Sequence, residues 1–195
     1  AFSHCLWYPL HITLPEGLTS IEPSTLSYSY WLNSITLPNS LTDLSFNPFV
    51  GCNQLTDIIV SPNHPTLEVI DGVLYNKAEK MLLTYPEAFQ SKEYIIPAGT
   101  LAIGKGAFCE NKVLESITLP DSLKSIGDSA FKRCELLTDI TLPDSLKSIG
   151  DYAFYQCELL TDITLPYGLT EIGDFAFCYC KKLNSIFLPD SLQKM

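Results

Sequence analysis

Hydrophobic and polar positions follow one frame along this chain, and the frame repeats every 23 residues. It reads I-x-L-P-x-(S/G)-L-x-x-I-G-D-x-A-F-x-x-C-x-x-L-x-x-I, and segments 119–141 and 142–164 are identical at 20 of 23 positions. The prolines of the frame are Pro15, Pro38, Pro97, Pro120, Pro143, Pro166 and Pro189. The apolar positions of the frame recur in each copy, whereas the positions marked x vary. This is typical of a solenoid, because each coil buries its apolar face only on neighbouring coils.

Each coil contains one short segment with the period of a β-strand. Ile163 and Leu165 alternate with Asp162 and Thr164, which predicts a strand with one buried face. Stacked copies would form a parallel sheet with strands ~4.8 Å apart. Pro166 closes the strand, because proline has no N–H to donate to a ladder.

The second half of each coil predicts a return along the opposite wall and a tight turn. Leu169 and Ile172 supply its buried positions, and Gly173–Asp174 turns the chain. We expect the Asp to cap a single helical turn that carries Ala176 and Phe177. No longer helix is predicted.

The frame is interrupted once, where the spacing lengthens by 13 residues within 61–93. Residues 69–75 and 80–85 read as two strands around the polar turn 76–79. We therefore expect an inserted β-hairpin at this point.

The pattern L-x-x-I-x-L-P-x-x-L-x-x-I-G-x-x-A-F-x-x-C resembles the leucine-rich repeat of the BspA-like (Treponema pallidum-type) class over nearly the whole chain. That resemblance implies a single leucine-rich repeat domain over 1–195, a right-handed curved solenoid of about eight ~23-residue coils. It implies a parallel β-sheet on the concave face, short strands and single helical turns elsewhere, and an inserted β-hairpin. The class offers no catalytic residues to carry over.

Composition and charge limit the partners. The chain is 46% hydrophobic and 17% charged, so it is expected to pack rather than remain disordered. Twelve Lys and Arg face 22 Asp and Glu, a net charge of −10. This charge disfavours nucleic acid and anionic membrane, and it suits either solubility or a basic partner. No apolar run approaches the ~20 residues that span a bilayer, so we expect no membrane insertion by this segment. Because the chain starts and stops inside repeats, we expect it to be a fragment of a longer one.

Seven cysteines raise the question of disulfides or metal. One slot of the frame holds Cys52, Cys134, Cys157 and Cys180, nearly holds Cys5, and holds Ser29 and Asn111 in other coils. A disulfide ladder, a metal site and a column of buried reduced thiols are the alternatives. Side chains in one column point the same way, and the count is odd, so the thiol column is favoured. Cys178 and Cys180 form a C-x-C without the second pair that zinc frames use.

Catalytic motifs are absent from the sequence. His4, His11 and His64 are its only histidines, and no G-x-S-x-G, H-E-x-x-H, G-x-G-x-x-G or Walker loop occurs. The acids that follow Gly in the frame are predicted to be turn and cap residues: Asp128, Asp151 and Asp174. We expect neither enzymatic activity nor a cofactor.

The outward face of the predicted sheet carries the candidate binding residues. One column reads His11, Ser34, Asp57, Glu93, Ser116, Asp139, Asp162 and Ser185, and the next reads Thr13, Thr36, Ile59, Ile95, Thr118, Thr141, Thr164 and Phe187. The three apolar members are either covered, by the hairpin or by a further coil, or serve as docking anchors among polar residues. The candidate ligand-binding residues are Asp57, Ile59, Glu93, Ile95, Asp139, Asp162 and Phe187.

Three functions fit these features. The resemblance suggests a cell-surface or secreted adhesion module that binds other proteins, with host extracellular-matrix proteins among the candidates. A structural spacer without a ligand is the second. A carbohydrate-binding module is the third, but exposed aromatics suited to sugars would come from Trp7, Trp31, Tyr28 and Tyr30, which cluster in the irregular N-terminal coils.

Overall fold

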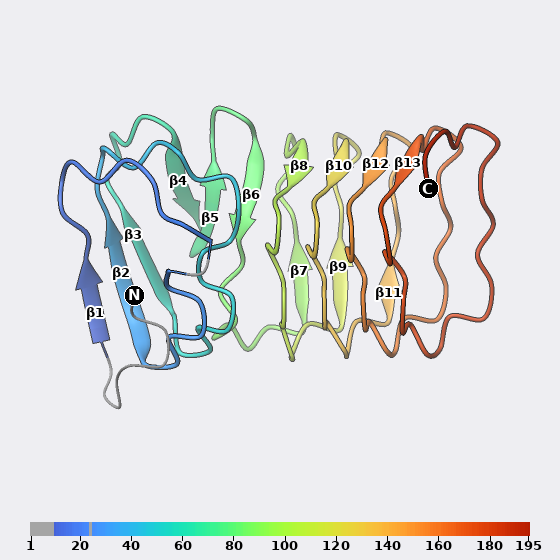
Figure 1. Ribbon diagram of the computed structural model, residues 1–195, viewed down its shortest axis with the longest axis horizontal. Coiled ribbons are helices and arrows are strands. Elements are labelled where there is room, and N and C mark those ends of the chain that lie inside the picture. Colours follow the sequence, from blue (N-terminus) through green and yellow to red (C-terminus); the bar gives the residue numbers. More distant parts are fainter. Residues whose placement is uncertain (1–9, 24) are drawn as a thin grey trace.

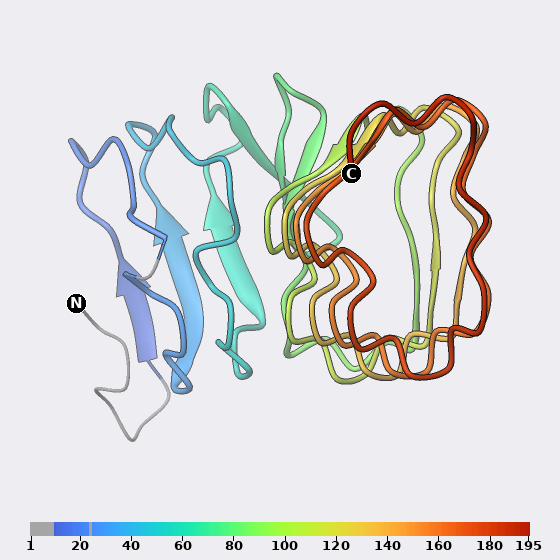
Figure 2. The same cartoon turned by 45° about the vertical axis from the view of Figure 1, so that its right-hand side comes forward.

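A computed structural model describes residues 10–23 and 25–195 and shows a solenoid of stacked coils (Figure 1). About seven coils are formed, close to the eight expected. Figure 2 shows the C-terminal coils more nearly end-on, so that the two walls of each coil are seen on opposite sides of its interior. His4, Cys5 and Trp7, which figured among the sequence candidates, lie outside the described residues.

Two parallel sheets form the wall that the repeat frame predicted as strands. The first has the order β1-β2-β3, and the second has the order β11-β9-β7. Their bounds are β1 (Leu10–Thr13), β2 (Leu32–Leu37), β3 (Asp57–Val60), β7 (Glu93–Ile95), β9 (Ser116–Thr118) and β11 (Asp139–Ile140). Ile117 pairs with Ile140, one repeat period away, so the register confirms the frame.

A seven-stranded sheet forms the opposite wall, in the order β13-β12-β10-β8-β6-β5-β4. Its strands are β4 (Leu67–Ile70), β5 (Val73–Asn76), β6 (Met81–Thr84), β8 (Ala102–Ile103), β10 (Ser125–Ile126), β12 (Ser148–Ile149) and β13 (Glu171–Ile172). The return segments therefore pair with one another in parallel from β8 to β13, in addition to lining the core.

The inserted hairpin is present as β5 and β6, but it has one strand more than expected. Asp71 and Gly72 have φ values of 49° and 81°, and this left-handed turn divides the predicted strand 69–75 into β4 and β5. Gly72 is required there, because a Cβ would lie 2.4 Å from the ring of Phe89. Strand β6 also pairs in parallel with β8, so the insertion extends the second wall rather than lying on its surface.

The predicted single helical turns are wrong: the described residues contain no helix. Ser129 and Arg133 adopt left-handed φ values of 54° and 60°. The amides of Ser129 and Phe131 donate to carbonyls of the next coil, each at 2.7 Å, while the amide of Ala130 donates to Gly127 at 3.2 Å. Because alternate N–H groups donate to the neighbouring coil, the hydrogen bonds from residue i to residue i−4 that define an α-helix cannot form.

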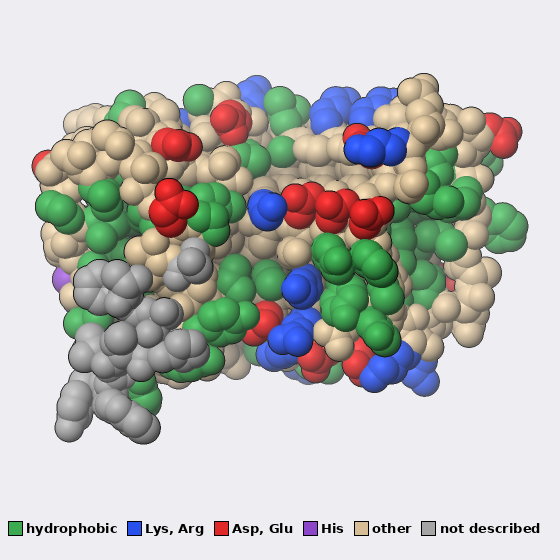
Figure 3. Space-filling model, viewed as in Figure 1, with side chains coloured by type: hydrophobic (Ala, Val, Ile, Leu, Met, Phe, Trp, Pro, Cys, Tyr) green, Lys and Arg blue, Asp and Glu red, His purple; other side chains and the backbone are tan. Residues whose placement is uncertain are grey.

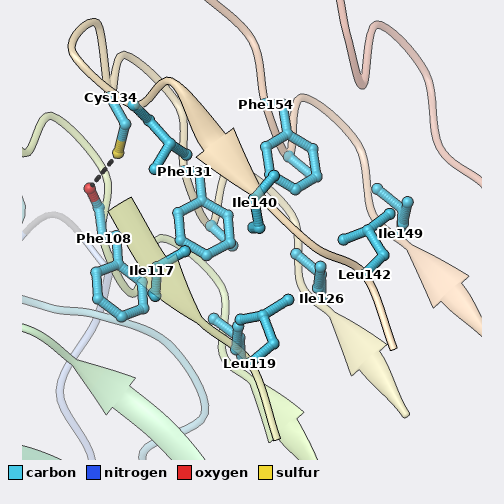
Figure 4. Packing of buried hydrophobic residues seen from close by; sticks show 14 of the residues in the cluster. Phe108, Ile117, Leu119, Ile126, Phe131, Cys134, Ile140, Leu142, Ile149 and Phe154 are labelled. Carbon is cyan, nitrogen blue, oxygen red and sulfur yellow. Dashed lines mark hydrogen bonds between the residues drawn. The ribbon is translucent and has the colours of Figure 1, made fainter. Parts of the chain in front are cut away.

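The core is a set of columns that run along the solenoid (Figure 4). Phe131 stacks between Phe108 and Phe154, with centroid separations of 5.0 and 5.2 Å. The thiol of Cys134 donates to the Phe108 carbonyl at 3.1 Å. The phenylalanine slot of the frame thus contacts the same slot in the coils before and after it.

The four cysteines of the described column are buried thiols, as the frame predicted. Each donates its S–H to a carbonyl of the preceding coil, at 3.1 to 3.2 Å: Cys52, Cys134, Cys157 and Cys180. Burial raises the pKa of Cys180 to about 11 and that of Cys52 to about 12. Asn111 fills the slot in another coil, where its Oδ1 accepts the amides of Val113 and Leu114.

The I-G-D triplet joins neighbouring coils. A Cβ on Gly150 would lie 2.6 Å from the Asp128 amide nitrogen, so glycine permits close contact between the coils. Asp128 accepts the Asp151 amide at 3.1 Å, and Asp151 accepts the Asp174 amide at 2.8 Å. The expected helix cap is therefore a carboxylate-to-amide contact between coils.

Candidate functional site

The strand wall presents the sequence-predicted binding residues to solvent. Asp57 and Ile59 lie on β3, Glu93 and Ile95 on β7, and Asp139 on β11, and all five are exposed. Asp162 pairs with Asp139 in an isolated parallel bridge and is also exposed. The period-two alternation therefore assigned the outward face correctly.

The predicted column is nevertheless divided into two parts. Asp57 and Ile59 belong to the first sheet, whereas Glu93, Ile95 and Asp139 belong to the second. The insertion between β3 and β7 explains the division, since it joins the opposite wall. We call the continuous C-terminal part the acidic strip; it consists of Glu93, Ser116, Asp139 and Asp162 with the neighbouring column Ile95, Thr118, Thr141 and Thr164.

The apolar members of the predicted site are not covered by the insertion. Ile59 is 47% exposed and Ile95 is 72% exposed. Phe187 is 86% exposed and lies outside the strands. Of the two explanations for these residues, cover by the inserted hairpin is wrong for both isoleucines.

The carboxylates of the acidic strip are not neutralised by neighbouring lysines. Six ion pairs join described residues, each between positions 23 apart: Lys92–Glu115, Lys105–Asp128, Lys112–Glu135, Glu110–Arg133, Glu158–Lys181 and Glu171–Lys194. None of these six involves Glu93, Asp139 or Asp162. The strip therefore keeps its negative charge at the surface, with Thr138 Oγ1 donating to Asp139 at 3.4 Å.

A groove of about 320 Å³ lies beside the strip, and sequence reasoning missed it. Asp139 and Asp162 line it together with Asp144, Thr164 and Tyr167. Tyr167 is 89% exposed. The signal was a departure from the frame, because the residue after proline is Asp in the copies at 121, 144 and 190 and Tyr at 167.

The two histidines that the structure describes, His11 and His64, have hydrogen-bonding roles. The ring of His11 lies 2.6 Å from Ser34 Oγ. His64 is buried, its Nε2 lies 3.0 Å from the Pro38 carbonyl, and its Nδ1 accepts the Leu67 amide. Within 10–23 and 25–195, no three His, Cys, Asp or Glu side chains are grouped to hold a metal ion.

Comparison with known families decides the class of this solenoid. The BspA type leucine rich repeat region matches residues 1–81 and 83–195 in six copies. The chain belongs to the BspA-type leucine-rich repeat family.

Several solved structures share this fold at modest identity. The pneumococcal vaccine antigen PcpA is 27% identical with a TM-score of 0.79, over 93% of this chain and 51% of that one. A leucine rich cell surface protein from Faecalibacterium prausnitzii is 27% identical with a TM-score of 0.64, over 90% and 59%. The T. pallidum leucine rich repeat protein is 27% identical with a TM-score of 0.51, over 80% and 59%. This chain therefore spans about half to three fifths of the length of these relatives.

Two features were sought and not found: a curated relative and, in the part of the chain that the structure describes, a membrane-spanning helix. No curated protein matches this chain. Among the residues that the structure describes, no helix has the length and apolar character needed to cross a bilayer.

Proposed function

We propose that this BspA-type domain is a non-catalytic recognition or adhesion module that binds another protein through its acidic strip. The observation that carries the proposal is the set of exposed carboxylates at Glu93, Asp139 and Asp162, which none of the ion pairs between coils uses. Exposed Ile95 and Tyr167 lie on or beside the same surface and offer apolar anchors among polar neighbours. Protein interfaces commonly combine such anchors with a polar rim.

The backbone supports this role, because it holds the strip in one geometry. Glu93, Ser116 and Asp139 are fixed in register by parallel pairing. A surface that is ordered before binding loses less conformational entropy when the partner arrives. Near-identical coils thus give a rigid, extended binding surface.

The partner that fits is a protein with a basic face. A net charge of −10 attracts cations and repels nucleic acid and anionic lipid. Host extracellular-matrix proteins are candidates, and a cell-surface or secreted location follows as part of the proposal. The name of the Faecalibacterium prausnitzii relative, a cell surface protein, supports this location.

The test is binding of the chain to immobilised matrix proteins at low and physiological salt, with two charge-matched variants. Asp139→Lys/Asp162→Lys reverses the strip, and Asp121→Lys/Asp190→Lys makes the same charge change at exposed sites outside it. We expect saturable, salt-sensitive binding that the strip variant weakens about tenfold or more and the control about twofold or less. Equal losses in both variants, or no loss in either with unchanged Tm, would show that the strip is not the site.

A structural spacer is the second candidate, and the near-identity of 119–141 and 142–164 favours it. A spacer needs length and stiffness but no particular outward residue. It predicts no saturable binding to any panel member, and equal thermal stability of the parent and the strip variant.

A further inference from the structure

Four aromatic side chains gather on a different wall from the acidic strip, on the turns that follow β12 and β13. We call Tyr152, Tyr155, Phe175 and Tyr179 the aromatic patch. Phe175 and Tyr179 are 58% and 59% exposed, and Tyr152 is 37% exposed. Figure 3 shows hydrophobic side chains beside a row of acidic ones on the front face. Clustered exposed apolar groups of this kind mark interaction surfaces.

The solenoid itself does not require aromatic residues at these positions. Segments 119–141 and 142–164 differ at three positions, where Ser129, Lys132 and Arg133 are replaced by Tyr152, Tyr155 and Gln156. The next coil has Phe175, Cys178 and Tyr179 at the same slots. All divergence between the two copies is therefore confined to this surface, where it introduces two of the four aromatic residues.

The rings form one contiguous surface across two coils. Tyr152 and Phe175 stack with centroids 5.2 Å apart and an interplanar angle of 16°. Tyr155 lies edge-on to Tyr152 at 5.6 Å and to Tyr179 at 5.3 Å. Each patch ring thus contacts another patch ring, and together they can act as a single contact area.

The chain already places one cation on this surface. The ammonium of Lys132 lies 5.7 Å from the ring centroids of both Tyr152 and Tyr155. Cations are attracted to aromatic faces at such distances, and arginine is used for this more often than lysine. Lys132 therefore shows which chemistry the rings accept.

Negative charge adjoins the rings. Asp151 and Asp174 immediately precede Tyr152 and Phe175, both carboxylate residues are exposed, and neither takes part in the ion pairs described above. Asp151 Oδ1 accepts the Asp174 amide, which leaves its second oxygen for another donor. Rings and carboxylates side by side are complementary to a cationic side chain rather than to a neutral ligand.

We propose that the aromatic patch is a second docking surface, independent of the acidic strip, that takes an arginine-rich segment of a partner protein. Guanidinium groups stack on the patch rings while Asp151 and Asp174 accept their N–H donors. Arginine fits better than lysine, because its planar cation stacks on rings and donates in a fork. The partner class is a protein with a basic, flexible segment.

The test uses labelled oligoarginine and oligolysine peptides of equal length and measures their affinity for the whole chain. The patch variant is Tyr152→Ser/Phe175→Ser. Serine occupies the equivalent position 129 with the same left-handed backbone, so we expect both positions to accept it. Phe187→Ser/Leu188→Ser is the matched control at exposed apolar sites that belong neither to the acidic strip nor to the aromatic patch. We expect oligoarginine to bind more tightly than oligolysine, and its affinity to fall about fivefold or more in the patch variant but less than about twofold in the control.

A gain-of-binding variant keeps the test valid if the double variant fails to fold. Lys132→Gln frees the rings of Tyr152 and Tyr155, whereas Lys124→Gln makes the same charge change at an exposed lysine away from the rings' cation contacts. We expect oligoarginine to bind more tightly to the Lys132 variant than to the Lys124 variant. Three results would overturn the proposal. One is equal oligoarginine affinity in the two lysine variants, and another is an equal loss of affinity in the two serine variants. The third is that the aromatic-patch variant loses binding to immobilised glycans while its affinity for oligoarginine is unchanged.

Discussion

Single residues of the I-G-D triplet decide how closely two coils approach. A Cβ at Gly150 would lie 2.6 Å from the Asp128 amide nitrogen and 2.8 Å from the Gly127 carbonyl carbon. Backbone atoms cannot move away as the tip of a long side chain can. The repeat frame contains this glycine in each regular coil. The sequence alone does not show that the backbone of the adjacent coil lies close enough to require it.

Gly150→Ala is expected to lower the free energy of unfolding by about 1–3 kcal/mol, because the added methyl forces the coils apart. Gly168→Ala is the matched control. Its Cβ would meet the Nζ of Lys147, a flexible tip that can move, and we expect a change below about 1 kcal/mol. Urea unfolding of both variants measures the difference, and equal destabilisation would contradict the close-approach explanation.

Cysteine reactivity should follow position within the coil. Cys134 and Cys157 are buried, and burial raises the pKa of both thiols well above the usual range. Cys178 is half-buried and outside the column. Because the thiolate is the reactive form, we expect iodoacetamide at pH 8 to modify Cys178 about tenfold or more faster than Cys157. Mass spectrometry of the labelled peptides measures the rates, which should become similar in urea; similar rates in the native chain would contradict the burial of the column.

At the scale of the element, the phenylalanine column holds successive coils together. Phe131 is fully buried between two stacked rings, whereas Phe187 is 86% exposed. Phe131→Ala is expected to cost about 3–5 kcal/mol, because it removes a large buried side chain and leaves a cavity. Phe187→Ala should cost less than about 0.5 kcal/mol. Thermal unfolding tests the contrast, and comparable losses would mean that the column is not the core.

The insertion is tied to the preceding coil through a half-buried carboxylate, that of Glu87. Gly51 donates its amide to Glu87 Oε1 at 2.5 Å. Burial is the main cause that raises the pKa of Glu87 to about 7, and the nearby Glu110 carboxylate adds to it while Lys112 opposes it. The folded chain therefore holds this proton at pH values where the unfolded chain has released it.

Glu87→Gln tests this joint, because glutamine cannot titrate. Since the folded pKa is raised above its ordinary 4.5, the parent gains stability as pH falls from about 7 to 4.5 and loses it as pH rises through 7. We expect the unfolding free energy of the variant, relative to that of the parent, to rise by about 1–3 kcal/mol between pH 5 and pH 8. Unfolding free energies measured at both pH values decide this, and a constant difference would show that Glu87 does not titrate in this range.

Elements that depend on repetition were predictable, and elements that depend on contacts between coils were not. The frame located β9 and β11 because their alternation recurs in each regular coil. It missed the helix-free turn after Gly127, because left-handed residues such as Ser129 and Arg133 have no strong sequence signal. It also missed the break at Asp71 and Gly72, where a dipeptide that favours turns sits inside an apolar run.

At the scale of the whole molecule, ion pairs and sheets follow the same spacing. The six ion pairs found among residues 10–23 and 25–195 join equivalent surfaces of adjacent coils, each across 23 residues. The outward residues of the candidate site were predictable from alternation alone. Their division into two sheets was not, since it depends on β6 pairing with β8 on the far wall. The aromatic patch was missed because its members lie in variable slots that a repeat frame treats as free.

The acidic strip is the central functional claim, and carboxylate footprinting tests it most directly. Carbodiimide-coupled labelling would be measured at Glu93, Asp139 and Asp162 on the strip and at Asp121 and Asp190 outside it, with and without a bound matrix protein. We predict that the partner protects the three strip carboxylates and leaves Asp121 and Asp190 labelled as in the free chain. Saturable binding without protection of the strip would contradict it.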